Sequence, residues 1–197
     1  MRRHLFLYLL LLACLMCQPL MAQTATPPAF HFRRTYWGMS KDEVKKTEDE
    51  KPVKEERAML AYSTIVAKRK MLVAYYFTAA GQLAKARYAV LEEHTNKNDF
   101  IEDYLALKAS LIDKYGHPAS DTTDWRNDLY KDDEAQHGFA VSLGHLVYEA
   151  TWETKTTDID LQLFGDNYEI HLFADYTSKV FGPTLRREQK EKEKEEF

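Results

Sequence analysis

The chain contains two sets of three short, β-rich apolar runs, and within each set only a few residues separate one run from the next. The first set covers residues 58–67, 70–78 and 83–92, and the second covers 147–154, 157–164 and 168–176. Gaps this short join antiparallel neighbours, because parallel strands need a crossover of a dozen or more residues. Each set therefore predicts an antiparallel meander.

A helix is predicted ahead of each set. Ser40 and Glu43 have the spacing of a capping box, which starts a short helix that ends near Glu50 and buries Val44. Residues 99–115 repeat apolar side chains every three to four positions, with Asp99 as the expected cap and Gly116 as the stop. A weaker helical pattern covers 133–145, and the residues before it, including Trp125, are predicted to form a polar loop.

The order of these elements predicts the fold class. A helix followed by three strands, repeated once, favours an α+β domain with an antiparallel sheet built from two halves, residues 37–92 and 99–177, and helices on one face. The single domain is expected to span residues 32–179, followed by a charged tail at 180–197 that forms a solvated helix or a disordered end.

The N-terminus has the order of a secretory signal peptide. Arg2 and Arg3 precede an apolar run at 5–15, and Ala22 supplies a small residue for cleavage, so residues 1–22 are the predicted signal and 23–31 a leader. In an alternative interpretation, Cys14 is the lipidated first residue of the mature chain. The apolar residues that follow Cys14 disfavour this lipid anchor. We expect a periplasmic or secreted protein with no transmembrane segment after cleavage.

Cleavage after Ala22 changes the cysteine count and the net charge of the mature chain. It removes both cysteines and two of the 27 basic residues, which leaves 25 against 31 acidic residues and a net charge of −6. A domain without disulfides must then rely on its core in an oxidising compartment. An acidic balance argues against nucleic acid as a partner, and seven well-separated glycines exclude glycine-rich phosphate loops.

Strand register in the second set predicts a cluster of carboxylates. Two-residue turns at 155–156 and 166–167 place Trp152, Ile159 and Ala174 in one buried row. On the opposite face the same register brings together Glu153, Asp158 and Asp175, with Asp160 one step along and His171 beside Gln162. Oxygen ligands of this kind suit calcium. The alternative is a set of water-facing carboxylates that needs no metal, and no other cofactor is predicted.

Two further residues are candidates for function. Residues 140–144 form a variant of the serine-hydrolase elbow around Ser142, and Asp160 and His171 follow in the order that α/β-hydrolases use. The antiparallel surroundings differ from the parallel sheet of those enzymes, so no catalytic residue is assigned. Trp125 is the tryptophan we expect to be exposed and to contact a partner.

Residues 37–44, Trp-Gly-Met-Ser-Lys-Asp-Glu-Val, resemble the start of helix-first repeats in small exported bacterial proteins. These include the SmpA/OmlA-type lipoproteins of outer-membrane assembly and the β-lactamase-inhibitor-protein family, and residues 115–118 are similar to their helix exits. The resemblance implies a non-catalytic module that binds a protein or another envelope component. The alternative is a small secreted hydrolase or a divalent-cation-dependent enzyme that uses Ser142 or the carboxylates.

Overall fold

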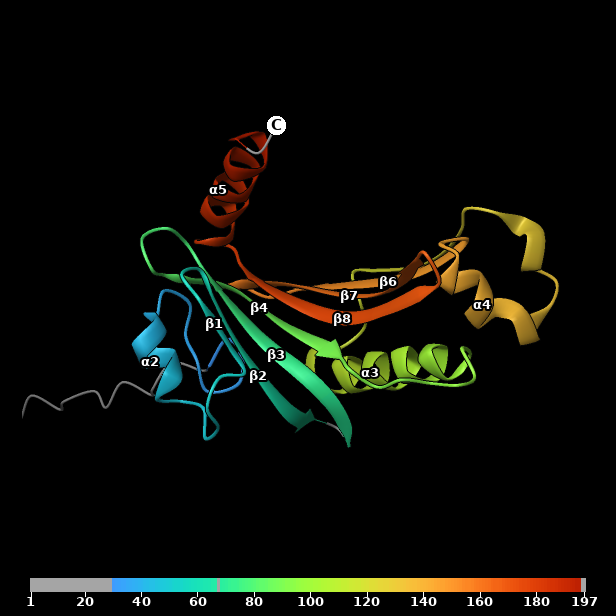
Figure 1. The fold of residues 1–197 in the computed structure, drawn as a ribbon, viewed down its shortest axis with the longest axis horizontal. Helices are drawn as coiled ribbons and strands as arrows, with labels where there is room; N and C mark the ends of the chain where they lie inside the picture. The colour runs from blue at the N-terminus through green and yellow to red at the C-terminus, as the bar shows by residue number, and fades with distance from the viewer. Residues whose placement is uncertain (1–29, 67, 196–197) are drawn as a thin grey trace, which may run out of the picture.

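The protein forms one antiparallel sheet with helices packed on it, as Figure 1 shows for a computed structural model that describes residues 30–66 and 68–195. The predicted signal peptide, Cys14 and nearly all of the leader lie outside the described residues. In the described ranges, eight strands pair in the order β1-β2-β3-β4-β8-β7-β6-β5. The strands are β1 (Lys54–Glu56), β2 (Met59–Val66), β3 (Arg69–Phe77), β4 (Leu83–Val90), β5 (Ser120–Trp125), β6 (Leu146–Glu153), β7 (Thr157–Asp166) and β8 (Glu169–Ser178).

The predicted α+β class is confirmed, and the six predicted runs are β2 to β4 and β6 to β8. Two strands were not predicted. The expected polar loop at Trp125 is instead β5, which pairs with β6 along its whole length. Its side chains from Ser120 to Asp124 are all exposed, so they carry no apolar alternation that reveals a strand. The three residues of β1 are exposed in the same way.

The helices begin close to where the sequence predicts and are shorter in two cases. They are α2 (Lys41–Lys45), α3 (Asp99–Tyr115), α4 (His137–Ser142) and α5 (Gly182–Glu195), with single turns η2 (Asp128–Tyr130) and η3 (Glu134–Gln136). The capping box is present, but α2 ends five residues before Glu50, because the chain then turns to bring Glu48 against Arg33. The cap position of α3 is Asn98 rather than Asp99.

The core lies on one face of the sheet. Strand side chains such as Tyr75 and Leu161 meet Val44 of α2 and Tyr104 of α3 in one buried cluster. The helix α4 adds Ala140 and contacts β6, β7 and β8. Seven of the residues that strand register predicts on the core face are buried: Ala150, Trp152, Ile159, Leu161, Leu163, Leu172 and Ala174.

The register between β7 and β8 differs from the prediction by two residues. Trp152 pairs with Ile159 as expected, but Ile159 pairs with Tyr176 rather than Ala174. The turn consists of Asn167 and Tyr168, both with positive φ, instead of the predicted 166–167. Because side chains alternate with a period of two, this shift keeps every residue on its predicted face and changes only its neighbours.

The charged tail forms the helix α5, one of the two predicted outcomes. Figure 1 shows α5 projecting from the side of the sheet opposite to α3. Leu185 is buried and α5 contacts β4, while Glu188 accepts a hydrogen bond from the backbone N–H of Ala79 at 2.8 Å. Within 30–66 and 68–195, no helix combines the length and the apolar character needed to cross a bilayer.

Candidate functional site

The side of the sheet that faces away from the core carries charged, polar and aromatic side chains. We call this side the outer face. One row across its centre runs from Arg87 through Asp175 and Asp160 to Thr151, and an adjacent row joins Phe173, Gln162 and Glu149. A third row joins Lys85, Thr177, Asp158 and Glu153.

The four carboxylates predicted to cluster are divided into two pairs. Glu153 lies opposite Asp158, and Asp160 lies opposite Asp175. The prediction that Asp175 shares a row with Asp158 was wrong, because the two-residue shift at β8 moves Asp175 beside Asp160. For the same reason His171 lies opposite Phe164 rather than beside Gln162.

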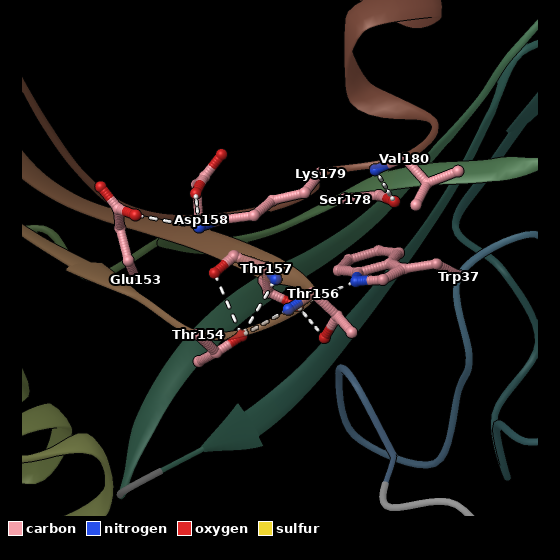
Figure 2. A network of polar contacts seen from close by, with 9 residues as sticks. All are labelled: Trp37, Glu153, Thr154, Thr156, Thr157, Asp158, Ser178, Lys179 and Val180. Carbon is pink, nitrogen blue, oxygen red and sulfur yellow. Dashed lines mark hydrogen bonds and ion pairs between the residues drawn. The ribbon is translucent and has the colours of Figure 1, made fainter.

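Lys179 holds the first pair of carboxylates, as Figure 2 shows. Its Nζ lies 2.9 Å from Oε2 of Glu153 and 3.3 Å from Oδ1 of Asp158. The hydrogen bond to Glu153 raises the pKa of Lys179, so the ammonium stays charged. The part of the chain that the structure describes contains no group of three or more His, Cys, Asp or Glu side chains able to hold a metal ion. Calcium binding here stays a prediction.

Arg87 and Lys85 neutralise Asp175 of the second pair. Arg87 donates from Nε and Nη2 to the two carboxylate oxygens at 2.6 and 2.7 Å, and Nζ of Lys85 lies 2.7 Å from Oδ2. The guanidinium also stacks on the ring of Phe173 at 3.7 Å. Burial acts to lower the pKa of Arg87, but the hydrogen bond and charge of Asp175 outweigh it and raise the pKa. Arg87 is thus a fixed cation with a preset orientation.

Asp160 is the one member of the four carboxylates without a cation bonded to it among the described residues. It accepts a hydrogen bond from Nε2 of Gln162 at 3.1 Å, and the same nitrogen donates to Glu149 at 2.9 Å. Oδ1 of Asp160 is buried and has no hydrogen-bond partner in the described structure. Burial, followed by the charges of Glu149 and Asp175, raises the pKa of Asp160 to about 6.

The structure does not bring the hydrolase-like residues together. Ser142 is fully buried in α4, and its hydroxyl donates to the carbonyl of Phe139 at 2.8 Å. Asp160 and His171 lie on strands β7 and β8, where they pair with Asp175 and Phe164. A nucleophilic serine needs an adjacent base and access to substrate, and the described surroundings of Ser142 give it neither.

Trp125 is half-buried at the end of β5 rather than displayed on a loop. Its ring packs edge-on against His137 with 4.9 Å between centroids. Part of the indole stays accessible, and partner contact at Trp125 remains a prediction.

Lys85, Arg87 and Phe173 belong to the outer face and were not predicted from the sequence, whereas Gln162 was predicted on this face beside His171. Arg87 and Asp175 are 88 residues apart in the chain, and only the pairing of β4 with β8 brings them together. The alternation of Lys85 and Arg87 with buried Ala84 and Ala86 does indicate that both cations leave the core face.

Fold and surface together define the class: an α+β protein whose continuous antiparallel sheet carries its core on one side and paired charges with aromatic rings on the other. Comparison of the chain with protein families, curated proteins and solved structures gives no match. The resemblance of residues 37–44 to exported repeat proteins therefore stays an expectation.

Proposed function

We propose that this chain is an exported, non-catalytic module that binds a protein or another component of the bacterial envelope through the outer face of its sheet. The proposal rests on one observation, the difference between the core face and the outer face of the sheet. On the core face, side chains of α2, α3 and α4 pack in the buried cluster. On the outer face Phe164 and Phe173 are half-buried and His171 is exposed, beside charges held in fixed positions.

The fixed charges favour recognition over catalysis. Arg87 is oriented by Asp175 and Phe173 before any partner arrives, so little side-chain entropy remains to be lost on binding. Arginine and aromatic side chains dominate the energetically important positions of protein interfaces. Charges on the same face set the register of a partner and exclude unsuitable ones.

We further propose that the domain consists of two related halves, residues 37–92 and 99–177, with the domain helices on one face. The strand order supports the proposal, since β1 to β4 occupy one half of the sheet and β5 to β8 the other. The last strands of the two halves, β4 and β8, pair antiparallel at the centre. This arrangement makes the outer face continuous across both halves.

Site-specific photo-crosslinking in cells tests the binding proposal. A photoreactive phenylalanine replaces His171, which is exposed on the outer face, or Leu129, which is 69% exposed in η2 and serves as the matched control. We expect position 171 to give a defined adduct with one envelope component and position 129 to give none. Equal adducts from both positions, or no adduct from position 171, contradict the proposal. Trp125→Ala in the 171 background then shows whether Trp125 contributes.

Export is tested separately by mass spectrometry of the protein recovered from the periplasm or the medium. The expected N-terminus is Gln23, which follows Ala22. A mature chain that starts at Cys14 with attached acyl groups contradicts cleavage at Ala22 and makes the protein membrane-anchored. A chain that retains Met1 in the cytoplasm contradicts export itself.

A further inference from the structure

A pocket of about 450 Å³ lies on the core side of the sheet, away from the charged rows of the outer face. It is bounded by the C-terminal end of α3, the turn between β6 and β7, and the segment that begins at Phe30. Phe30, Tyr115 and Ile159 supply apolar lining, and Lys114 and Lys155 supply charge. The volume falls within the range of about 300–1,000 Å³ that is typical of pockets for small molecules.

The charge of this pocket is opposite to that of the whole protein. Among the residues that the structure describes, no carboxylate lines the pocket, although the chain has 31 acidic and 27 basic residues. Lys114 and Lys155 form no ion pair with any residue in the described ranges, and the ammonium of Lys114 lies 4.9 Å from the centre of the Tyr115 ring. Two ammonium groups without a counter-charge at the rim of a partly apolar pocket attract an anion.

The walls of the pocket are held in place before any ligand binds, as Figure 2 shows for the β6–β7 turn. The hydroxyl oxygen of Thr154 accepts hydrogen bonds from the backbone N–H groups of Thr156 and Thr157 at 3.3 and 3.0 Å. Nε1 of Trp37 donates to the hydroxyl of Thr157 at 2.9 Å. The backbone N–H of Trp37 donates to Nδ1 of His31 at 2.9 Å, and the two rings stack 5.8 Å apart. A ligand therefore meets a formed site and does not have to order it.

We propose that this pocket binds a small organic anion with a flat apolar part, of the class of aromatic carboxylates. Lys114 and Lys155 contact the carboxylate, and the rings of Phe30 and Tyr115 contact the apolar part. The proposal is independent of partner binding at the outer face, because none of these residues belongs to that face.

Isothermal titration calorimetry on the mature chain tests it with a matched pair of compounds. The first compound is 1-naphthoate, and the second is 1-naphthamide, which has the same ring and nearly the same shape but no charge. We expect 1-naphthoate to bind at least about tenfold more tightly than 1-naphthamide, and its advantage to shrink as salt is raised. Equal affinities, or no binding of either compound, overturn the proposal.

Variants at the two lysines locate the binding. Lys114 and Lys155 are both exposed, so Lys114→Gln with Lys155→Gln is expected to fold normally and to remove the preference for 1-naphthoate. Replacement of both by arginine keeps the charge and is expected to retain binding. Lys51→Gln, at an exposed lysine with no ion pair to a described residue, is the control. A double glutamine variant that binds 1-naphthoate like the wild type overturns the assignment of the lysines.

Discussion

Arg33 holds both carboxylate oxygens of Glu48, with Nε and Nη2 at 3.0 and 2.9 Å, in a pair that is almost closed to solvent on the Glu48 side. Only 5% of the Glu48 side chain is exposed, and the hydroxyl of Tyr75 on β3 donates to the same carboxylate. Burial and the bond to Glu48 raise the pKa of Tyr75, so the hydroxyl remains a donor. This contact joins the N-terminal segment and the chain after α2 to the sheet.

Glu48→Gln should destabilise the protein by about 2–4 kcal/mol, because it leaves a half-buried guanidinium without its counter-charge. The matched control is Asp49→Asn, whose partner Arg34 is 50% exposed and whose own side chain is 86% exposed. That change should cost less than about 0.5 kcal/mol. Urea denaturation measures the free energy of unfolding of both variants. A similar decrease in the two variants contradicts the structural role of Glu48.

Asp160→Asn should stabilise the protein at neutral pH. The folded-state pKa of about 6 lies above the ordinary value of 3.8, so the folded protein binds more protons than the unfolded chain between about pH 4 and 6. Stability is therefore lost as pH rises through this window, and the variant avoids the loss. With allowance for solvent screening, we expect a gain of about 1 kcal/mol at pH 7 and none at pH 4.

The measurement is the difference in unfolding free energy between wild type and Asp160→Asn as a function of pH. Asp158→Asn provides the comparison, since Asp158 is neutralised by Lys179 and lies near the same surface. A difference that does not change between pH 4 and 7 in the Asp160 variant contradicts the raised pKa.

Gly165→Ala should be strongly destabilising. A Cβ at this position lies 2.2 Å from the carbonyl oxygen of Val141 and 2.6 Å from Cα of Ser142, so the backbone of α4 must move away from β7. Overpacking against backbone is expected to cost about 3 kcal/mol or more. Gly81→Ala is the comparison. The positive φ at Gly81 adds strain of about 1–2 kcal/mol, but an added Cβ would meet no atom of the described residues within 4 Å. Thermal melts rank the two variants, and equal losses show that α4 does not pack as described.

Calcium should leave the thermal midpoint unchanged up to millimolar concentrations. Lys179 already neutralises Glu153 and Asp158, and Arg87 and Lys85 already neutralise Asp175, so a cation must displace bonded side chains to reach oxygen ligands. Melts with calcium, with magnesium and with a chelator make the comparison. A midpoint that rises with calcium alone contradicts this expectation and confirms the calcium site predicted at these carboxylates.

Much of the fold follows from local patterns in the sequence. Ser40 and Glu43 predict the start of α2 because a capping box satisfies backbone N–H groups through neighbours three residues apart. Gly116 ends α3 with a φ of 83°, which glycine adopts readily. Strand β5 was not predicted, because it joins the sheet through backbone pairing with β6 while its side chains are mostly exposed. Exposed side chains show no apolar alternation in the sequence.

At the candidate site, local sequence patterns predict the face of each side chain but not its cross-strand neighbours. Alternation placed Asp160 and Asp175 on the face away from the core, since a period of two depends only on the strand itself. The cross-strand neighbours of these two carboxylates depend on the turn between β7 and β8. Tyr168 in this turn has a φ of 70°, a conformation that a tyrosine in the sequence does not predict. The sequence alone therefore determined six of the strands, the starts of the helices and the face on which the strand side chains lie, through contacts a few residues apart. The tertiary structure decided which charges meet. The pairing of β4 with β8 brings Arg87 to Asp175, and the turn after α2 brings Glu48 to Arg33, across stretches of chain that no periodicity links.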